Sequence, residues 1–484
     1  MKKCAVIGSG IAGLAAAIRL SARGYSVDLF EANDYPGGKL RQHAVDGFRF
    51  DMGPSVFTMP HLIDELFTLC GKNPRDYFTY TRLQTSFRFF FDDGTCILAY
   101  ADADKFAKEI AEKSQDDEQR FRRYLKDSAA KFDITNGVFI ENSLHVIKNY
   151  FTKRVVYGLF KFHKIDAFKS MHRGNAQFFK DPKIVQLFDH YASYVGSNPL
   201  VAPATLNLIP HLVIDIGTYM PDKGMYSIVE AMVKLAKEVG VRFHFGKKVD
   251  EIMVTDHVAT GLKVGHEAIS FDRIISNMDV YFTYTRLLAR EKQPKRILRQ
   301  PKSSSILGFY WGVKGEHDQL GVHNMLFTSD EKKEYQAVFD QHTISDDPSV
   351  YICITSKHVK GDAPAGCENW FIIVTAPNDT GQNWDELVAR TRANVLAKIR
   401  KRLGIDLDIQ NEHVLTPPVI KEKYASAFGA VFGNSSNNKF AAFLRHPNFS
   451  NRIKGLYFVG GSVHPGAGIP MCLNSAKIMD KVFE

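Results

Sequence analysis

The hydrophobic and polar positions at the start of the chain predict a β-strand, a tight turn and an α-helix in succession. Residues 4–7 form an uninterrupted apolar run, and residues 11–23 carry apolar side chains at helical spacing. Gly24 is placed to end that helix. Residues 26–30 alternate as a second strand, which a right-handed crossover places parallel to the first. The chain therefore opens with a compact βαβ unit.

Strand and helix patterns alternate through the rest of the chain. Residues 87–91 and 95–100 flank an Asp-Gly turn and predict a β-hairpin, whereas the strongly charged residues 101–132 predict a solvated helical region. From residue 224 onward the pattern is again α/β. The predicted elements there are helices 225–239 and 385–402, strands 241–245, 248–254, 273–276, 304–311, 350–355 and 370–375, and a hairpin of 258–264 with 267–271.

The composition is that of an ordinary globular protein with two or three domains. The 484 residues are 45% hydrophobic and 24% charged. We expect no transmembrane helix, because no run of 18 apolar residues occurs. The glycines and Arg19 in the first apolar run argue against a signal peptide. Six cysteines without a Cys-x-x-Cys pair indicate a reducing compartment, and no metal-binding residues are expected.

Positive charge gathers in residues 143–180. The whole chain carries a net charge of +9, which favours an anionic partner. This segment holds eight Lys or Arg and one acid, Asp166, interleaved with Phe and Tyr. A solvated face over core aromatics, a patch for an anionic membrane surface and a nucleic-acid site are the three interpretations. Because no recognised nucleic-acid module accompanies the segment, a membrane surface is the expected partner and nucleic acid is not.

The first turn carries a dinucleotide-binding pattern. Gly8-x-Gly10-x-x-Gly13 follows the first strand and opens the first helix. The first glycine permits the tight turn, the second lets a pyrophosphate approach the backbone, and the third lets helix and strand pack closely. The helix N-terminus favours the phosphate charge. Glu31, at the end of the second strand, is placed to accept hydrogen bonds from ribose hydroxyls.

A second glycine pair and the C-terminal stretch favour FAD over NAD. Gly37-Gly38-Lys39-Leu40 follows Glu31, and NAD-dependent dehydrogenases do not need this pair. Here the chain resembles flavoproteins with two dinucleotide-binding domains, in which such a pair and a basic residue lie near the FAD. Residues 455–477 again read as strand, glycine-rich turn and helix. Two such units at opposite ends of the chain indicate one long ligand held by both.

The C-terminal turn narrows the resemblance. Residues 462–470, Ser-Val-His-Pro-Gly-Ala-Gly-Ile-Pro, resemble the signature of the bacterial-type carotenoid desaturases, the phytoene desaturase family. The resemblance covers essentially the whole chain, although Lys223 replaces one glycine that the family usually has. By the family's pattern, the backbone of Val249 contacts the adenine, and Gly461 and 468–471 lie along the flavin. The FAD-binding residues expected from the motifs and the resemblance are Gly8, Gly10, Ile11, Ala12, Gly13, Glu31, Ala32, Gly38, Lys39, Leu40, Gly53, Pro54, Ser55, Val249, Asn277, Gly460, Gly461, Gly468, Ile469, Pro470 and Met471.

The resemblance implies that the chain desaturates a carotenoid. Two hydrogens leave a CH2–CH2 unit, with FAD taking a hydride, and a long apolar substrate needs a Phe-rich tunnel that excludes water. Residues 30–40 look closer to the branch that acts at the 3,4 position of 1-hydroxycarotenoids or γ-carotene-type substrates, with phytoene desaturase as the alternative. A carotenoid isomerase, a retinol saturase-like enzyme, a flavin amine oxidase and a non-catalytic lipid-binding escort protein, which have the same or a related fold, are further alternatives. No catalytic base is identified.

One histidine stands near the predicted flavin. This residue, His464, is the catalytic candidate, although a histidine before proline in a turn is more often structural. The electron acceptor, oxygen or a quinone, stays open. The resemblance implies a cytoplasmic protein that associates peripherally with the inner face of the cell membrane.

The expected fold is α/β. It comprises a Rossmann-like FAD-binding domain of the flavin amine oxidase type, an inserted mixed-sheet substrate domain and a helical membrane-facing region. We expect residues 1–75, 220–290 and 440–484 to form the FAD-binding domain. Residues 76–100 and 291–439 would form the substrate domain, and residues 101–219 a helical cap.

Overall fold

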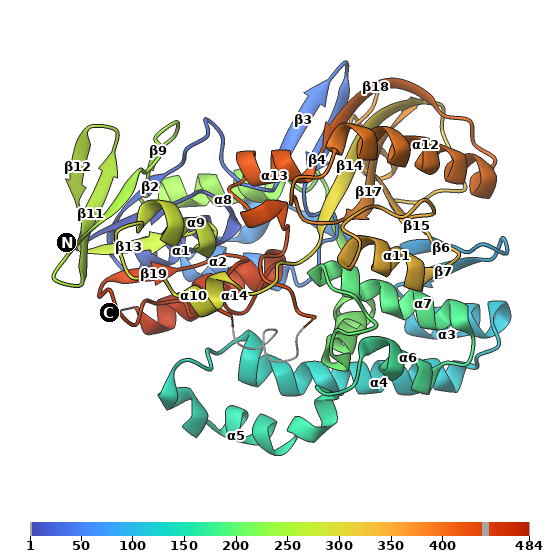
Figure 1. The fold of residues 1–484 in the computed structure, drawn as a ribbon, viewed down its shortest axis with the longest axis horizontal. Coiled ribbons are helices and arrows are strands. Elements are labelled where there is room, and N and C mark those ends of the chain that lie inside the picture. The colour runs from blue at the N-terminus through green and yellow to red at the C-terminus, as the bar shows by residue number, and fades with distance from the viewer. Residues whose placement is uncertain (1, 438–444, 484) are drawn as a thin grey trace.

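A computed structural model describes residues 2–437 and 445–483 of the chain. Figure 1 shows a parallel sheet on the left, a larger sheet at the upper right and helices below it. The strands of the parallel sheet are β1 (Lys3–Ile7), β2 (Ser26–Phe30), β9 (Arg242–His244), β13 (Arg273–Ser276) and β19 (Leu456–Phe458), in the order β19-β13-β1-β2-β9. Both ends of the chain therefore contribute strands to one sheet.

The parallel sheet is buried on both faces, which explains the uninterrupted apolar run of its first strand. Val6 packs with the helices of one face, and Ala5 packs on the opposite face. The helices are α1 (Ile11–Ala22), α2 (His61–Leu69), α8 (Ser227–Glu238) and α14 (Ile469–Val482). The opposite face is covered by an antiparallel sheet of β10 (Glu251–Thr255), β11 (Val258–Val264) and β12 (Glu267–Ser270).

The larger sheet is mixed. Its strands, in spatial order, are β18 (Asp408–Leu415), β14 (Ser305–Lys314), β17 (Cys367–Ala376), β16 (Val350–Ile354), β15 (His323–Leu326), β6 (Thr85–Phe90) and β7 (Cys96–Tyr100). β15 and β6 pair in parallel, and the other described neighbours pair antiparallel. Helix α12 (Trp384–Leu403) covers one face through Val395 and Ile399, which pack with the buried Trp311 and Trp370. β14 and β17 pair over their full length, so β17 is longer than the predicted 370–375.

Helices cover the other face of the larger sheet. They are α3 (Ala103–Lys113), α4 (Glu118–Thr135), α6 (Met171–Phe178) and α7 (Pro182–Asp189), with α5 (Lys153–Phe160) outside them (Figure 1). Phe178 and Phe179 pack around Tyr124 in this core and do not belong to an exposed patch. Among the described helices, none combines the length and the apolar composition that a membrane crossing requires.

Short elements connect these layers. They are the pair β3 (Arg41–Val45) and β4 (Phe48–Met52), the pair β5 (Tyr80–Arg82) and β8 (Tyr219–Pro221), and helices α9 (Val280–Phe282), α10 (Lys295–Leu298), α11 (Glu331–Phe339) and α13 (Pro417–Lys423). Phe48 and Phe50 lie within the expected FAD-binding segment 1–75 but pack in the core of the larger sheet. The expected boundary between residues 439 and 440 lies outside the described residues.

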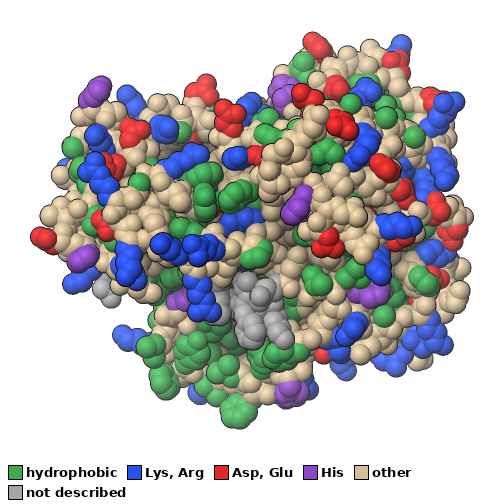
Figure 2. Space-filling view, viewed as in Figure 1, with side chains coloured by type: hydrophobic (Ala, Val, Ile, Leu, Met, Phe, Trp, Pro, Cys, Tyr) green, Lys and Arg blue, Asp and Glu red, His purple; other side chains and the backbone are tan. Residues whose placement is uncertain are grey.

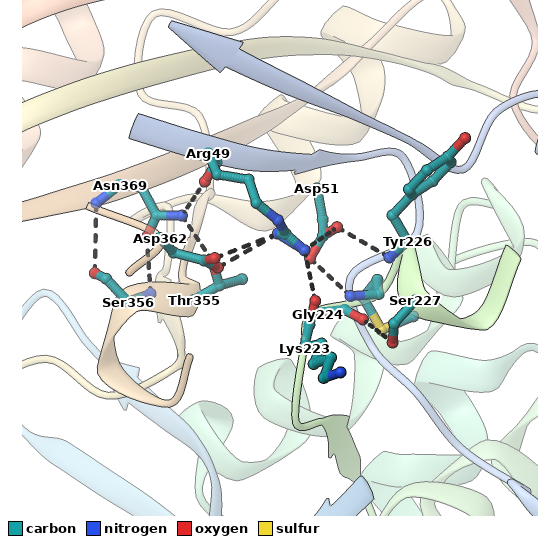
Figure 3. Close-up of polar contacts among 11 residues, drawn as sticks. Arg49, Asp51, Lys223, Gly224, Tyr226, Ser227, Thr355, Ser356, Asp362 and Asn369 are labelled. Atoms are coloured by element: carbon teal, nitrogen blue, oxygen red, sulfur yellow. Dashed lines mark hydrogen bonds and ion pairs between the residues drawn. The ribbon is translucent and has the colours of Figure 1, made fainter. Parts of the chain in front are cut away.

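A buried ion pair joins the two sheets. Figure 3 shows Arg49 and Asp51 of β4 between the start of α8 and the loop after β16. The Asp51 carboxylate accepts backbone hydrogen bonds from Met225 (2.7 Å) and Tyr226 (3.0 Å), and Arg49 Nη2 lies 3.1 Å from it. Arg49 also pairs with Asp362 across 3.4 Å. Burial raises the pKa of Asp51 to about 6. The carboxylate is therefore ionised at neutral pH and held by its donors.

We expect Asp51→Ala to lower the free energy of unfolding by about 3 kcal/mol, because it removes one partner of the partly buried Arg49 and leaves two backbone N–H groups without their acceptor. Urea unfolding followed by circular dichroism measures this. The control is Asp406→Ala, which removes one partner of the exposed Arg400–Asp406 ion pair and should cost less than about 0.5 kcal/mol.

The pH dependence of stability tests the same role of the Asp51 carboxyl. Since its folded pKa lies above its unfolded value, the folded protein retains a proton that the unfolded chain has released between about pH 4 and pH 6. As the pH rises from about 4 to about 6, the free energy of unfolding of the natural protein relative to that of Asp51→Ala should therefore decrease. Above pH 6 the difference should stay constant. A constant difference from pH 4 to pH 6 would contradict the assignment.

Candidate functional site

One cavity of about 1270 Å³ runs between the two sheets. Its walls come from the first glycine-rich turn, the segments after β2 and β4, and the C-terminal turn. The same cavity continues between the larger sheet and the helices that cover it, where Phe87, Phe327, Tyr194 and Tyr351 line it. A glycine-lined region and an aromatic region therefore share one continuous space.

The first glycine-rich turn has the geometry of a dinucleotide cradle. Gly8 has a φ of +94°, which favours glycine. A Cβ on Gly13 would lie 2.1 Å from the Gly8 carbonyl oxygen, so only glycine lets α1 pack on β1 here. Gly8 and Gly10 line the cavity, whereas Gly13 lies behind them and does not. Gly13 thus has the packing role that its place in the motif predicts.

Asn277 joins the two glycine-rich turns. A Cβ on Gly10 would lie 2.9 Å from Asn277 Nδ2, and one on Gly460 would lie 2.8 Å from Asn277 Oδ1. The amide also donates a hydrogen bond to the Gly8 carbonyl (3.2 Å). The absence of side chains at these glycines therefore brings β1, β13 and β19 close enough to form one wall.

Glu31 is held by the protein itself. Its Oε2 accepts hydrogen bonds from the amide and hydroxyl of Ser9 (2.8 and 2.7 Å), and its Oε1 accepts from the amide and side chain of Asn33 (both 2.9 Å). These donors occupy the four acceptor positions of a carboxylate. Glu31 therefore fixes the first turn, and a ribose hydroxyl that reaches it must displace the Ser9 or Asn33 side chain.

The segment after β2 crosses the first turn and leads toward the aromatic region. A Cβ on Gly38 would lie 3.3 Å from the Cα of Gly10, and one on Gly53 would lie 2.1 Å from the Lys39 carbonyl oxygen. Lys39 donates to the Val431 carbonyl (2.9 Å), and burial lowers the pKa of its ammonium. Residues 37–40 and 53–55 therefore form one strip along the cavity, the 37–55 strip.

The C-terminal turn forms the opposite wall. Gly468, with a φ of +104°, precedes α14, and no atom lies within 4 Å of the position of a Cβ there. Ile469, Pro470 and Met471 of the first turn of α14 also line the cavity. The N-termini of α1 and α14 thus both reach the cavity, and each favours negative charge. Glycine backbones and two helix N-termini fit the pyrophosphate and the flat ring of a flavin dinucleotide.

His464 lies behind this wall. It is fully buried, does not line the cavity, and its Nε2 is 2.8 Å from the Asn142 carbonyl oxygen. Burial lowers the pKa of its imidazole to about 4, so the ring is neutral at physiological pH. His464 connects the C-terminal turn to the helical region, which is a structural position.

The other expected residues converge on the cavity. Of the expected FAD-binding residues, all except Gly13 line it, including Ala32, Leu40, Val249 and Gly461. Their contacts with FAD stay a prediction. Gly37, the first glycine of the Gly37-Gly38 pair, also lines the cavity. Sequence reasoning missed the aromatic residues of the lining, Phe87, Tyr194 and Tyr351, because nothing local distinguishes an aromatic residue facing a cavity from one in the core.

Comparison with known proteins identifies the class. The profile described as flavin containing amine oxidoreductase matches residues 11–478. A 1-hydroxycarotenoid 3,4-desaturase from a Flavobacterium species is 46% identical over 480 residues, covering 99% of this chain and 98% of that protein. A 4,4'-diapolycopene oxygenase from a Methylomonas species is 35% identical over 497 residues, covering 99% and 97%. The crystal structure of cyclohexylamine oxidase from Brevibacterium oxydans has a TM-score of 0.62 at 13% identity, covering 99% and 98%.

The chain belongs to the flavin containing amine oxidoreductase family and has the α/β fold of that class. Within the class it belongs to the carotenoid desaturase and oxygenase family, as residues 462–470 predicted. It is a FAD-dependent oxidoreductase. The expected parallel sheet and mixed substrate sheet are both confirmed.

We expect Gly10→Ala to weaken FAD binding at least about tenfold, because the added methyl group meets Asn277 and occupies the cradle. Titration of the apoprotein with FAD, followed by flavin absorbance, measures this. The matched control is Gly321→Ala, whose Cβ would meet only the flexible Arg88 side chain at 3.2 Å, outside the cavity lining. Equal FAD affinity in the two variants would contradict the assigned cradle.

Proposed function

We propose that this enzyme desaturates the 3,4 bond of a 1-hydroxycarotenoid or a γ-carotene-type substrate. The observation that carries the proposal is the continuous cavity, which runs from the glycine-lined walls into an aromatic region. A polyene is long, apolar and nearly without polar groups, and such a cavity suits it. The relative at 46% identity, named a 1-hydroxycarotenoid 3,4-desaturase, supports the same choice of bond.

The residues of the chain bind and orient the substrate. Bound FAD supplies the hydride acceptor, which no amino-acid side chain provides. Phe139 and Phe327 line the space beyond the 37–55 strip, together with aliphatic residues such as Leu212 and Met325. These walls exclude water and hold the polyene in one orientation, and such positioning alone contributes strongly to catalysis. The 37–55 strip and the C-terminal turn define where the oxidised bond must lie.

We further propose that an apolar surface near the cavity rests on an anionic membrane. Side chains that are 73–82% exposed, namely Ile147, Phe151, Phe160 and Phe168, lie on and beside α5. Figure 2 shows hydrophobic side chains gathered at this lower edge of the molecule. Lys148, Lys153 and Lys164 are exposed within the same segment. Exposed aromatics among cations suit a lipid surface, where rings enter the headgroup boundary and cations attract anionic lipids.

This surface, the α5 surface, lies directly against the cavity wall. A Cβ on Gly158 of α5 would lie 2.0 Å from the side chain of Val138. Val138 belongs to a π-helical turn, Asn136–Ile140, whose Phe139 and Ile140 line the cavity. A carotenoid dissolved in lipid would therefore have a short path from the membrane to the reacting bond.

We expect the FAD-loaded enzyme, supplied with a 1-hydroxylated monocyclic carotene in vesicles, to yield a product lighter by two hydrogen atoms. Its visible absorption should shift to the red, because the conjugated system gains one double bond. Liquid chromatography with mass spectrometry and absorbance detection measures both. Preferential conversion of phytoene, or a product that gains oxygen, would contradict the proposed bond.

We expect Phe151→Ser with Phe160→Ser to weaken binding to vesicles that contain anionic lipid by at least about tenfold, because each exposed phenylalanine contributes on the order of 2 kcal/mol when it enters the lipid boundary. Vesicle flotation measures the bound fraction. The control Leu69→Ser removes a side chain that is 48% exposed on α2, away from the α5 surface. If the control and the double variant bind vesicles equally, the α5 surface is not the membrane contact.

A further inference from the structure

Three polar side chains form a hydrogen-bonded chain in the wall of the aromatic region. The hydroxyl oxygens of Ser55 and Tyr351 lie 2.8 Å apart, and the Tyr351 hydroxyl lies 2.8 Å from Nδ1 of His323. All three residues are buried, and Ser55 and Tyr351 line the cavity. The second ring nitrogen of His323, Nε2, is buried without a hydrogen-bond partner. Buried polar groups in an apolar wall cost free energy, so this arrangement calls for an explanation.

Aromatic rings surround these three hydrogen-bonded side chains. Phe87 stacks on His323 with ring centroids 5.1 Å apart, and it lies 6.2 Å from Tyr351. Burial lowers the pKa of His323 to about 3 and raises that of Tyr351 well above its usual value. The imidazole and the phenol are therefore both uncharged at physiological pH. An uncharged hydroxyl pair is suited to bind an uncharged polar group rather than an ion.

Either direction of this hydrogen-bond chain leaves Ser55 able to bind a ligand. If His323 donates to Tyr351 and Tyr351 donates to Ser55, the Ser55 hydroxyl is free to donate into the cavity. If the direction is reversed, Ser55 donates to Tyr351 and its oxygen is free to accept from the cavity. An alcohol both donates and accepts, so it satisfies Ser55 in both cases.

The position of Ser55 matches the chemistry of the proposed substrate. Ser55 ends the 37–55 strip, two residues after Gly53, where an added Cβ would lie 2.1 Å from the Lys39 carbonyl oxygen. In a 1-hydroxycarotenoid oxidised at its 3,4 bond, only three single bonds separate the hydroxyl oxygen from C3, a span of at most about 4 Å. The hydroxyl must therefore be bound where the strip passes from the glycine-lined region to the aromatic region.

A second pair of unpartnered polar atoms fits this requirement less well. The Nε2 of His190 and the hydroxyl of Tyr194 also lack partners, and both residues line the cavity. His190 packs against Phe89 and Phe327, with ring centroids 6.4 and 5.9 Å apart. Phe89 in turn stacks on Phe87 at 5.5 Å. His190 and Tyr194 belong to the turn His190–Val195 of the helical region, whereas Ser55 lies on the 37–55 strip itself.

We infer that Ser55 and Tyr351 form the subsite that binds the tertiary hydroxyl of the substrate and thereby select hydroxylated carotenoids. This inference rests on the proposed function. His323 is a positioning residue, because it fixes the direction of the Tyr351 hydroxyl without reaching the substrate. The subsite holds the hydroxyl and so sets which carbon–carbon bond lies at the reacting position.

The test compares two carotenes with the same skeleton, one with and one without the 1-hydroxyl, as substrates of the FAD-loaded enzyme. We expect the natural enzyme to have the higher kcat/KM for the hydroxylated substrate. Ser55→Ala and Tyr351→Phe should each lower the ratio of kcat/KM for the hydroxylated substrate to kcat/KM for the other substrate about tenfold. His323→Leu should reduce the selectivity, and His323→Asn should restore part of it, because an amide again faces the Tyr351 hydroxyl.

Matched controls separate lost selectivity from lost packing. Ser86→Ala removes a buried serine hydroxyl that donates to the Ala99 carbonyl, and Tyr191→Phe removes a buried phenol without a partner. Neither residue lines the cavity, so both variants should keep the natural selectivity. Selectivity that survives in Ser55→Ala and Tyr351→Phe would overturn the inference and leave the proposed function intact. If the natural enzyme desaturates neither substrate, both the subsite inference and the proposed function are wrong.

Discussion

The buried carboxylate of Asp51 is the interaction on which the arrangement of this molecule depends. It accepts hydrogen bonds from two backbone N–H groups at the start of α8, a helix that packs on the parallel sheet. It also pairs with Arg49, which in turn pairs with Asp362 in the loop after β16 of the larger sheet. A Cβ on Gly224 would lie 2.0 Å from Arg49 Nη2, so this joint also requires a glycine. The cavity also lies between the two sheets, which Arg49 and Asp51 connect.

The cavity combines two kinds of wall. At one end, glycines let backbone amides and two helix N-termini approach an anionic dinucleotide. At the other end, aromatic and aliphatic side chains surround a space that suits a polyene. The 37–55 strip crosses from one region to the other, beginning against Gly10 and ending at Ser55. A cofactor and a substrate bound in these regions would meet at that crossing, where the structure provides the hydroxyls of Ser55 and Tyr351.

The α5 surface lies on the outer side of the cavity wall. Its exposed phenylalanines lie one helix away from Phe139 and Ile140 of the cavity wall. A lipid-dissolved substrate gains from a protein that rests on the membrane, because the apolar chain then avoids water on its way to the site. As proposed, the polar subsite and the apolar surface would have different roles, since the surface would admit any long polyene and the subsite would select among them.

The sequence by itself determined the βαβ unit, the FAD-binding motifs and the family. Those signals are local, because a tight turn at Gly8 and close packing at Gly13 restrict residue type wherever the turn occurs. The strand at 273–276 was also predictable, and its two adjacent isoleucines, Ile274 and Ile275, are buried on opposite faces of the sheet. The tertiary structure alone decided that Phe179 is core and Phe160 is exposed, although both stand in the same basic, aromatic segment. It also decided that Ser55, His323 and Tyr351 meet, because the hydrogen bonds of Tyr351 to Ser55, 296 positions away, and to His323, 28 positions away, depend on how β15, β16 and the 37–55 strip pack.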